Sequence, residues 1–177
     1  MKIILIGIQG AGKSTQGNLL TNKLNIPYLS TGHIFRDMAK EKTPMGRYIK
    51  ETMNAGFLIP DDKTIEVVEE YLKKSEYQKG YIMDGFPRTL AQAKKFHNGI
   101  DKVFYIEVSD KEALWRLFGR DENREDDTLA AIRKRIALFH EVTEPVLDYY
   151  KEKGALVRIN GEQSVADIHK EIMSKIS

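Results

Sequence analysis

Eight residues near the start of the chain have the types and spacing of a phosphate-binding loop. The segment Gly7-Ile-Gln-Gly-Ala-Gly-Lys-Ser14 matches the pattern G-x-x-x-x-G-K-[ST]. In this pattern the glycines permit a tight turn whose backbone N–H groups point at phosphate oxygens, the lysine reaches the terminal phosphates and the hydroxyl can face Mg²⁺. A chance match in a chain of this composition has a probability of about 1%. The sequence therefore predicts a nucleotide phosphate site around Lys13 and Ser14.

A carboxylate stands at the end of an apolar segment, Tyr81-Ile-Met-Asp84. An aspartate at a strand end is more often a turn residue or a helix cap. Beside a phosphate loop, however, such a carboxylate can hold Mg²⁺ or its waters at the carboxyl edge of a sheet. With the loop present we favour the metal role for Asp84.

Arginines are concentrated in one stretch of the chain. Five of the nine arginines lie between residues 116 and 135 together with one lysine, although 19 of the 28 basic residues are lysines. Guanidinium groups grip phosphate oxygens with two N–H groups at once, and phosphoryl transfer depends on positioning and on stabilising negative charge. Ion pairs on an exposed helix with Glu122, Asp126 and Asp127 remain the alternative for any single arginine. For all of them together phosphate binding is the better interpretation.

The elements that must hold these residues alternate along the chain. Apolar or β-branched runs predict strands over residues 3–8, 27–30, 80–84, 102–108 and 155–160. Helical periodicity lies between them. Asp61 and Asp62 are expected to cap a helix with Ile65, Val68 and Leu72 on one face, and Ser164 a helix with Val165, Ile168, Ile172 and Ile176 on one face. This alternation predicts an α/β sandwich with a parallel sheet.

The composition limits the class of protein. A chain of 177 residues predicts one domain, and a net charge of +2 speaks against a protein that coats nucleic acid. The absence of cysteine removes thiolate zinc sites and cysteine nucleophiles. The longest apolar run, residues 3–8, is far shorter than the roughly 20 residues of a membrane helix and is not followed by a signal-peptide cleavage region. We expect a cytoplasmic protein without membrane or nucleic-acid partners.

Several segments together resemble the nucleoside monophosphate kinases, and specifically the adenylate kinase family, over the chain from Met1 to about Ile176. The most diagnostic is Asp84-Gly-Phe-Pro-Arg-Thr-Leu-Ala-Gln92. The others are residues 7–16, Ser30-Thr-Gly-His-Ile-Phe-Arg36, Leu114-Trp-Arg-Leu-Phe-Gly-Arg120, Arg124-Glu-Asp-Asp127, Arg133-Lys-Arg135 and Asn160-Gly-Glu-Gln163.

The resemblance implies reversible, Mg²⁺-dependent transfer of the ATP γ-phosphoryl group to AMP, giving two ADP, by a monomer. It implies the fold of the P-loop nucleoside triphosphate hydrolases, a three-layer sandwich with a five-stranded parallel sheet. In this single kinase domain, residues 1–29, 76–120 and 128–177 form the core, 30–75 a helical monophosphate-binding insert and 121–127 a short lid. No zinc site is expected in that lid.

The resemblance also implies the site residues. The catalytic residues are Lys13, Arg88, Arg120, Arg124 and Arg135. ATP is bound by Gly10, Ala11, Gly12, Lys13, Ser14, Thr15, Arg116, Arg120 and Gln163. AMP is bound by Thr31, Arg36, Met53, Phe57, Leu58, Ile59, Gly85, Phe86, Pro87, Arg88, Gln92, Arg124 and Arg135. Ser14, Thr15 and Asp84 face Mg²⁺, in part through water.

The chain departs from the family pattern at several positions. Three residues separate Arg120 from Arg124, which indicates a short lid. Ser14 stands where glycine is common, His33 where aspartate is usual, and Gln9 and Phe57 replace a frequent proline and lysine.

Two other functions compete with the adenylate kinase reaction. A UMP/CMP kinase shares the short lid and the same signatures, but Thr31 and Gln92 favour adenine, because an amide can both donate to and accept from a purine edge. A non-catalytic ATP-sensing module would have the phosphate loop without the arginines.

Overall fold

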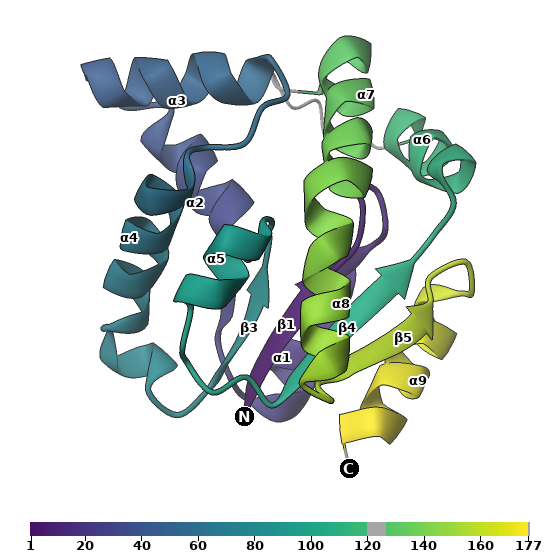
Figure 1. Ribbon diagram of the computed structural model, residues 1–177. Helices are drawn as coiled ribbons and strands as arrows, with labels where there is room; N and C mark the ends of the chain where they lie inside the picture. The colour runs from purple at the N-terminus through teal and green to yellow at the C-terminus, as the bar shows by residue number, and fades with distance from the viewer. Residues whose placement is uncertain (120–126, 177) are drawn as a thin grey trace.

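The computed structural model describes residues 1–119 and 127–176, and these form a five-stranded parallel sheet covered by helices (Figure 1). The sheet has the order β2-β3-β1-β4-β5. Its strands are β1 (Lys2–Ile6), β2 (Tyr28–Ser30), β3 (Tyr81–Asp84), β4 (Lys102–Glu107) and β5 (Leu156–Asn160). All five predicted strands are present. The first ends two residues earlier than expected, because residues 7 and 8 already belong to the loop.

The register of the strands brings the chemically important segments to one edge. Asp84, the last residue of β3, pairs with Leu5 of β1 on one side and with Ser30 of β2 on the other. The loops that leave β1, β2 and β3 therefore begin side by side. In an open parallel sheet, ligands bind outside the carboxyl ends of the strands.

Helices cover both faces of the sheet and produce the three predicted layers. Helices α1 (Lys13–Leu24) and α9 (Val165–Ile176) pack against each other, as do α5 (Leu90–Lys95) and α8 (Glu144–Glu152). In Figure 1, α5 and α8 lie in front of the sheet and α1 lies behind it. Because β1, β3 and most of β4 are buried on both faces, they read as continuous apolar runs in the sequence.

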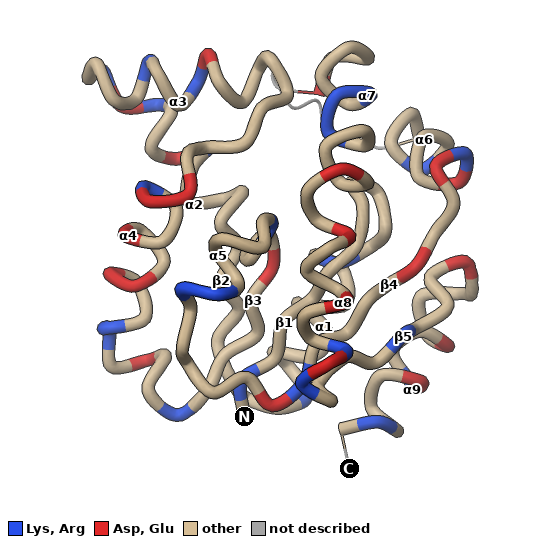
Figure 2. Tube along the Cα trace, in the orientation of Figure 1, with Lys and Arg blue, Asp and Glu red and all other residues tan. Residues whose placement is uncertain are grey.

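The segment after β2 is helical and extends from the side of the sheet at β2 and β3 (Figure 1). It contains α2 (Thr31–Met38), α3 (Pro44–Asn54), α4 (Asp61–Leu72) and a short 3₁₀ helix (Ser75–Tyr77). Basic and acidic residues stand together along α3, whereas the charged residues of α4 are mostly acidic (Figure 2). The division into core, insert and lid stays a prediction.

Two details of the predicted helices are wrong. Pro60, not an aspartate, precedes the first residue of α4, and no side chain caps that helix. Asp61 and Asp62 are instead its first two residues, where carboxylates favour the positive end of the helix dipole. Ser164 does cap α9, because its Oγ accepts from Asp167 N at 3.2 Å, but Val165 is 51% exposed and does not share the buried face of Ile168 and Ile172.

The remaining helices flank the predicted lid. α6 (Asp110–Phe118) precedes it, and α7 (Leu129–Leu138) follows it and continues through a π-helical turn (Phe139–Thr143) into α8. Leu117 of α6 packs with Ile132 and Ile136 of α7 in a small cluster separate from the main core. Arg120, Arg124 and lid residues 121–126 lie outside the described residues. In the parts of the chain that the structure describes, no helix is both long and apolar enough to cross a membrane.

His140 joins α6 to the start of α8 and gives the fold a pH-dependent contact. Its Nδ1 lies 2.6 Å from Glu144 Oε1 and its Nε2 lies 2.9 Å from Asp110 Oδ1. Hydrogen bonds to these carboxylates raise the pKa of His140 above its ordinary value. A raised pKa in the folded state stabilises the fold fully below about pH 6.5, and the stabilisation is lost as pH rises through the raised pKa.

We therefore expect His140→Gln to lower the melting temperature more at pH 5.5 than at pH 8.5. Because the side chain is 45% exposed, solvent screening limits the difference to below about 1 kcal/mol, or roughly 1–3 °C. Thermal unfolding at the two pH values measures it, with His97→Gln, at an exposed position, as the matched control. An equal loss at both pH values for His140→Gln would contradict the expectation.

Candidate active site

The phosphate loop has the backbone geometry that anion binding requires. Gly10 and Gly12 adopt φ values of 91° and 88°, in the left-handed region that favours glycine. A Cβ at Gly10 would also lie 2.7 Å from the backbone oxygen of Ala113. Gly12 precedes α1. Because glycine has no side chain, the first N–H groups of α1 have no side-chain cap. A helix N-terminus reached through such a loop is an anion site.

The ammonium group of Lys13 lies over the same loop. Its Nζ donates to the backbone oxygens of Gly7 at 2.8 Å and Ile8 at 2.9 Å. The side chain is therefore held at the mouth of the loop, where a phosphate would be its strongest partner because both carry full charges.

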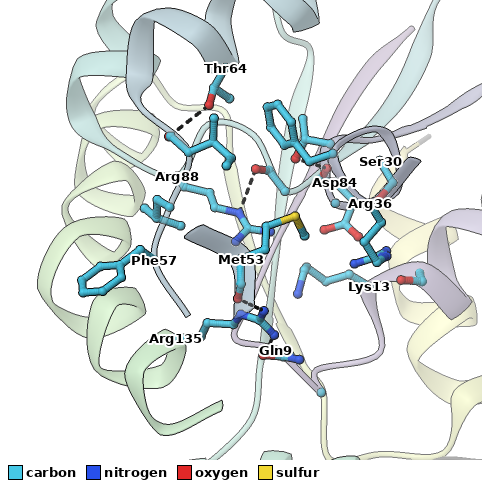
Figure 3. A pocket seen from close by; sticks show the side chains of 18 of the residues that line it. Gln9, Lys13, Ser30, Arg36, Met53, Phe57, Thr64, Asp84, Arg88 and Arg135 are labelled. Atoms are coloured by element: carbon cyan, nitrogen blue, oxygen red, sulfur yellow. Dashed lines mark hydrogen bonds between the residues drawn. The ribbon is translucent and has the colours of Figure 1, made fainter. Parts of the chain in front are cut away.

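A cavity opens beside the loop at the carboxyl edge of the sheet (Figure 3). It gathers most of the predicted site residues from five segments of the chain. They are Gly10, Gly12, Lys13, Ser14, Thr15, Thr31, Arg36, Met53, Phe57, Leu58, Ile59, Asp84, Gly85, Arg88, Gln92 and Arg135. Phe86 and Pro87 line a second, smaller cavity, whose lining also includes Lys13, Arg88 and Arg135.

Some residues differ from the sequence-based expectation. Ala11 is fully buried and lines neither cavity, and neither do Arg116 and Gln163. The cavity is also lined by Gln9, Ser30, Gly32, Phe35 and Thr64, which were not among the predicted site residues. The first four lie within the motifs that the sequence analysis quotes, so their position in the sequence could have identified them as site residues. Thr64 lies inside α4, and no motif in the sequence pointed to it.

Three arginines reach the cavity from different elements (Figure 3). Arg88 follows β3, and its Nε donates to Gly85 O at 2.9 Å. Arg36 comes from α2. Arg135 comes from α7 and donates to Asp127 Oδ1 at 3.0 Å, Gln9 Oε1 at 3.2 Å and Met53 O at 2.8 Å.

The bonds of Arg135 connect three distant parts of the chain. Gln9 of the phosphate loop donates to the same Asp127 oxygen at 2.6 Å. The Arg135–Asp127 ion pair is only 13% and 15% exposed at its two side chains. Arg135 therefore ties α7 to the phosphate loop and, through Met53, to α3.

Asp84 is buried, and only one of its two carboxylate oxygens has a hydrogen-bond partner among the described residues. Its Oδ2 accepts from the Tyr28 hydroxyl at 2.8 Å, whereas its buried Oδ1 has no hydrogen-bond partner among the described residues. Burial has the largest effect on the pKa of Tyr28 and raises it, and the charge of Asp84 raises it further. The hydroxyl therefore stays protonated and remains a donor. Because Asp84 lines the same cavity as Ser14 and Thr15, this orphaned carboxylate oxygen fits a site for hydrated Mg²⁺. Among the residues that the structure describes, no group of three or more histidine or acidic side chains could hold a metal ion.

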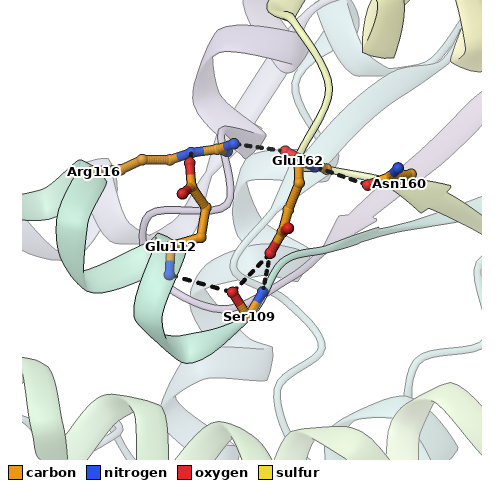
Figure 4. A network of polar contacts seen from close by, with 6 residues as sticks. Ser109, Glu112, Arg116, Asn160 and Glu162 are labelled. Carbon is orange, nitrogen blue, oxygen red and sulfur yellow. Dashed lines mark hydrogen bonds and ion pairs between the residues drawn. The ribbon is translucent and has the colours of Figure 1, made fainter.

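A separate polar network lies at the start of α6 (Figure 4). Arg116 donates to Glu112 Oε1 at 2.7 Å and to Gly161 O at 2.8 Å. Glu162 Oε1 accepts from the N–H and the hydroxyl of Ser109, and these two bonds lower the pKa of Glu162. The loop after β5 is therefore fixed against α6, and Arg116 of this helix supplies one of the bonds.

Gln163 donates through its Nε2 to Asn160 O of this loop and to Glu171 Oε2 of α9. The donor-binding roles of Arg116 and Gln163 stay predictions.

Gln92 is 2% exposed and held from two sides. Its Oε1 accepts from Arg88 N at 2.7 Å, and its Nε2 donates to Asp61 Oδ1 at 2.8 Å. Helix α5 begins at Leu90, so Arg88 precedes the helix and the two residues do not share a helical face. The bond from Arg88 N to the amide nevertheless keeps them together.

The chain is similar to known proteins of one family. The sequence model described as adenylate kinase matches residues 5–155. An adenylate kinase of Caldicellulosiruptor bescii is 36% identical over 212 residues, covering 99% of each chain. One of Cyanothece sp. is 39% identical over 180 residues, covering 97% of this chain and 92% of the relative, and one of Staphylococcus aureus is 34% identical over 209 residues, covering 98% and 97%. The chain therefore belongs to the adenylate kinase family of phosphotransferases.

Proposed function

We propose that the chain transfers the γ-phosphoryl group of ATP to AMP, reversibly and with Mg²⁺, to give two ADP. One observation carries the proposal. The phosphate loop, three arginines from α2, the β3 loop and α7, and the buried amide of Gln92 all line one cavity. A loop alone would hold a triphosphate, whereas the added arginines supply a place for a second anion in front of it.

The chemistry follows from positioning and charge. The loop N–H groups and Lys13 hold the β- and γ-phosphates, and Arg36 and Arg88 hold the acceptor phosphate in line. Lys13, Arg88 and Arg135 also line the smaller cavity, so positive charge surrounds the place where the two phosphates would meet. Holding both reactants in line removes much of the entropic barrier, and fixed cations stabilise the negative charge that develops during transfer. Arg120 and Arg124 would add to this charge from the lid.

Mg²⁺ would be held by the Ser14 and Thr15 hydroxyls and, through water, by the unpaired Oδ1 of Asp84. When bound, it neutralises phosphate charge between the β- and γ-groups. The burial of Asp84 and its bond from Tyr28 keep this carboxylate oriented.

The acceptor base would lie between apolar side chains and one amide. Met53, Leu58 and Ile59 line the same cavity as Gln92. Phe57, also in its lining, is 52% exposed, with Lys134 Nζ 4.9 Å from its ring centre. Thr31 Oγ1 is buried against Asp84 O, at 3.4 Å. That the chain is a monomer remains a prediction. The cytoplasmic location and the absence of nucleic-acid partners remain predictions.

A panel of monophosphates tests this function. We expect kcat/KM with ATP to be at least about 10²-fold higher for AMP than for CMP or UMP, because a pyrimidine leaves polar groups of the pocket unpaired. Gln92→Ala should erode this ratio through the AMP value and leave KM for ATP nearly unchanged. Comparable values for CMP and AMP in the unmutated chain would favour the UMP/CMP kinase. ATP binding without any transfer would favour the ATP-sensing module.

A further inference from the structure

The orientation of the Gln92 amide is fixed by two partners of opposite character. A carboxylate can only accept, and a backbone N–H can only donate. In the observed orientation Nε2 faces Asp61 Oδ1 at 2.8 Å and Oε1 faces Arg88 N at 2.7 Å. A flipped amide would place oxygen against oxygen and N–H against N–H. Both existing bonds would then be replaced by repulsive contacts.

Asp61 is itself held in place. It is the first residue of α4, and its Oδ1 also accepts from the Thr89 hydroxyl at 2.9 Å. Thr89 Oγ1 in turn accepts from Gln92 N at 3.2 Å and caps α5. The carboxylate, the helix cap and the amide thus form a closed ring of hydrogen bonds between α4 and α5.

These bonds leave the amide with a defined capacity. After bonding to Asp61 and Arg88, Gln92 keeps one N–H on Nε2 and one lone pair on Oε1. A 6-amino purine presents an amino donor beside a ring-nitrogen acceptor, whereas a 6-oxo purine presents a carbonyl acceptor beside a ring N–H donor. An amide held in one orientation matches only one of these edges, but an amide that can flip matches either.

We propose that Asp61 is a positioning residue that makes the acceptor pocket select a 6-amino purine over a 6-oxo purine by opposing, together with the Arg88 N–H, the flip of Gln92. The inference rests on the proposed function, since it takes the cavity around Gln92 as the acceptor-base site. Asp61 does not itself touch the base. It acts through the amide.

The test compares kcat/KM for AMP and IMP, with ATP as donor. Asp61→Asn keeps the shape of the side chain but replaces an obligate acceptor with an amide that can also donate to a flipped Gln92, so that only the Arg88 N–H still opposes the flip. We expect the unmutated chain to prefer AMP by at least about 10²-fold and Asp61→Asn to narrow this ratio at least about tenfold, with the IMP value rising. KM for ATP should not change.

The neighbouring Asp62 provides the matched control. It is exposed, pairs with Lys95 at 2.7 Å and occupies the second position of the same helix, so Asp62→Asn removes the same charge from the helix terminus without touching Gln92. Its AMP/IMP ratio should equal that of the unmutated chain. A purely structural effect of Asp61→Asn would lower both values together and leave the ratio unchanged.

A folded Asp61→Asn variant whose ratio stays within about twofold of the unmutated chain would overturn the inference. Should this variant fail to fold, Asp61→Ser, which also suits the first turn of a helix, removes the carboxylate and carries the same expectation. If the unmutated chain does not phosphorylate AMP at all, the proposed function fails. An AMP-active chain with an unchanged ratio rejects only the role of Asp61.

Discussion

Replacing Lys13 with methionine is expected to lower kcat by at least about 10³-fold while leaving the protein folded. Lys13 is the only cationic side chain in loop residues 7–14, so no neighbour in the loop can replace its charge. The variant loses two hydrogen bonds to the backbone oxygens of Gly7 and Ile8, which costs about 1–3 kcal/mol of stability. A coupled assay measures kcat, and thermal unfolding shows that the variant is folded.

Lys23→Met is the matched control for this variant. Lys23 lies exposed in the last turn of the same helix, so the substitution removes the same charge away from the loop. We expect kcat of the control to stay within about twofold of the unmutated chain, as for a surface change. Near-normal kcat in folded Lys13→Met would remove the loop from the catalytic account.

Replacing Arg88 with alanine should lower kcat by about 10²–10³-fold with little change in ATP affinity. The Arg88 side chain lines both cavities, between the phosphate loop and the proposed acceptor. Its contact would therefore strengthen as charge develops during transfer. The backbone of Arg88 is held independently, because its N–H donates to Gln92 Oε1 and its oxygen accepts from Thr143 Oγ1 at 2.8 Å. The loop should keep its shape without the guanidinium.

Calorimetry with ATP alone separates binding from transfer in this variant. Arg47→Ala, on the exposed side of α3, controls for the loss of one arginine and should behave as the unmutated chain. If ATP affinity collapsed in Arg88→Ala, Arg88 would have to be assigned to donor binding instead.

The strands and the phosphate loop could be predicted from the sequence because their signals are local. A parallel strand buried on both faces is a short apolar run, and the loop motif stands directly between such a run and a helix. The predicted Ser164 cap also depends only on neighbouring residues. The arginines of α2, the β3 loop and α7 could be assigned to one site only through the family resemblance, since sequence spacing alone does not bring them together.

The contacts that position these residues could not be predicted, because they join segments far apart in the chain. Asp61 was expected to cap its own helix, whereas its carboxylate bonds to Thr89 and Gln92 on another helix. The bond between Gln9 and Asp127 depends equally on tertiary packing. Val165 follows the helical period but is exposed, because α9 buries only part of the predicted face.

A nucleotide balance on the purified chain is the direct test of phosphoryl transfer from ATP to AMP. The chain is incubated with MgATP and AMP, and all nucleotides and free phosphate are quantified by chromatography over time. We expect each AMP consumed to remove one ATP and to yield two ADP, without free phosphate, and ADP alone to yield ATP and AMP. Release of free phosphate from ATP with AMP left unchanged would contradict it.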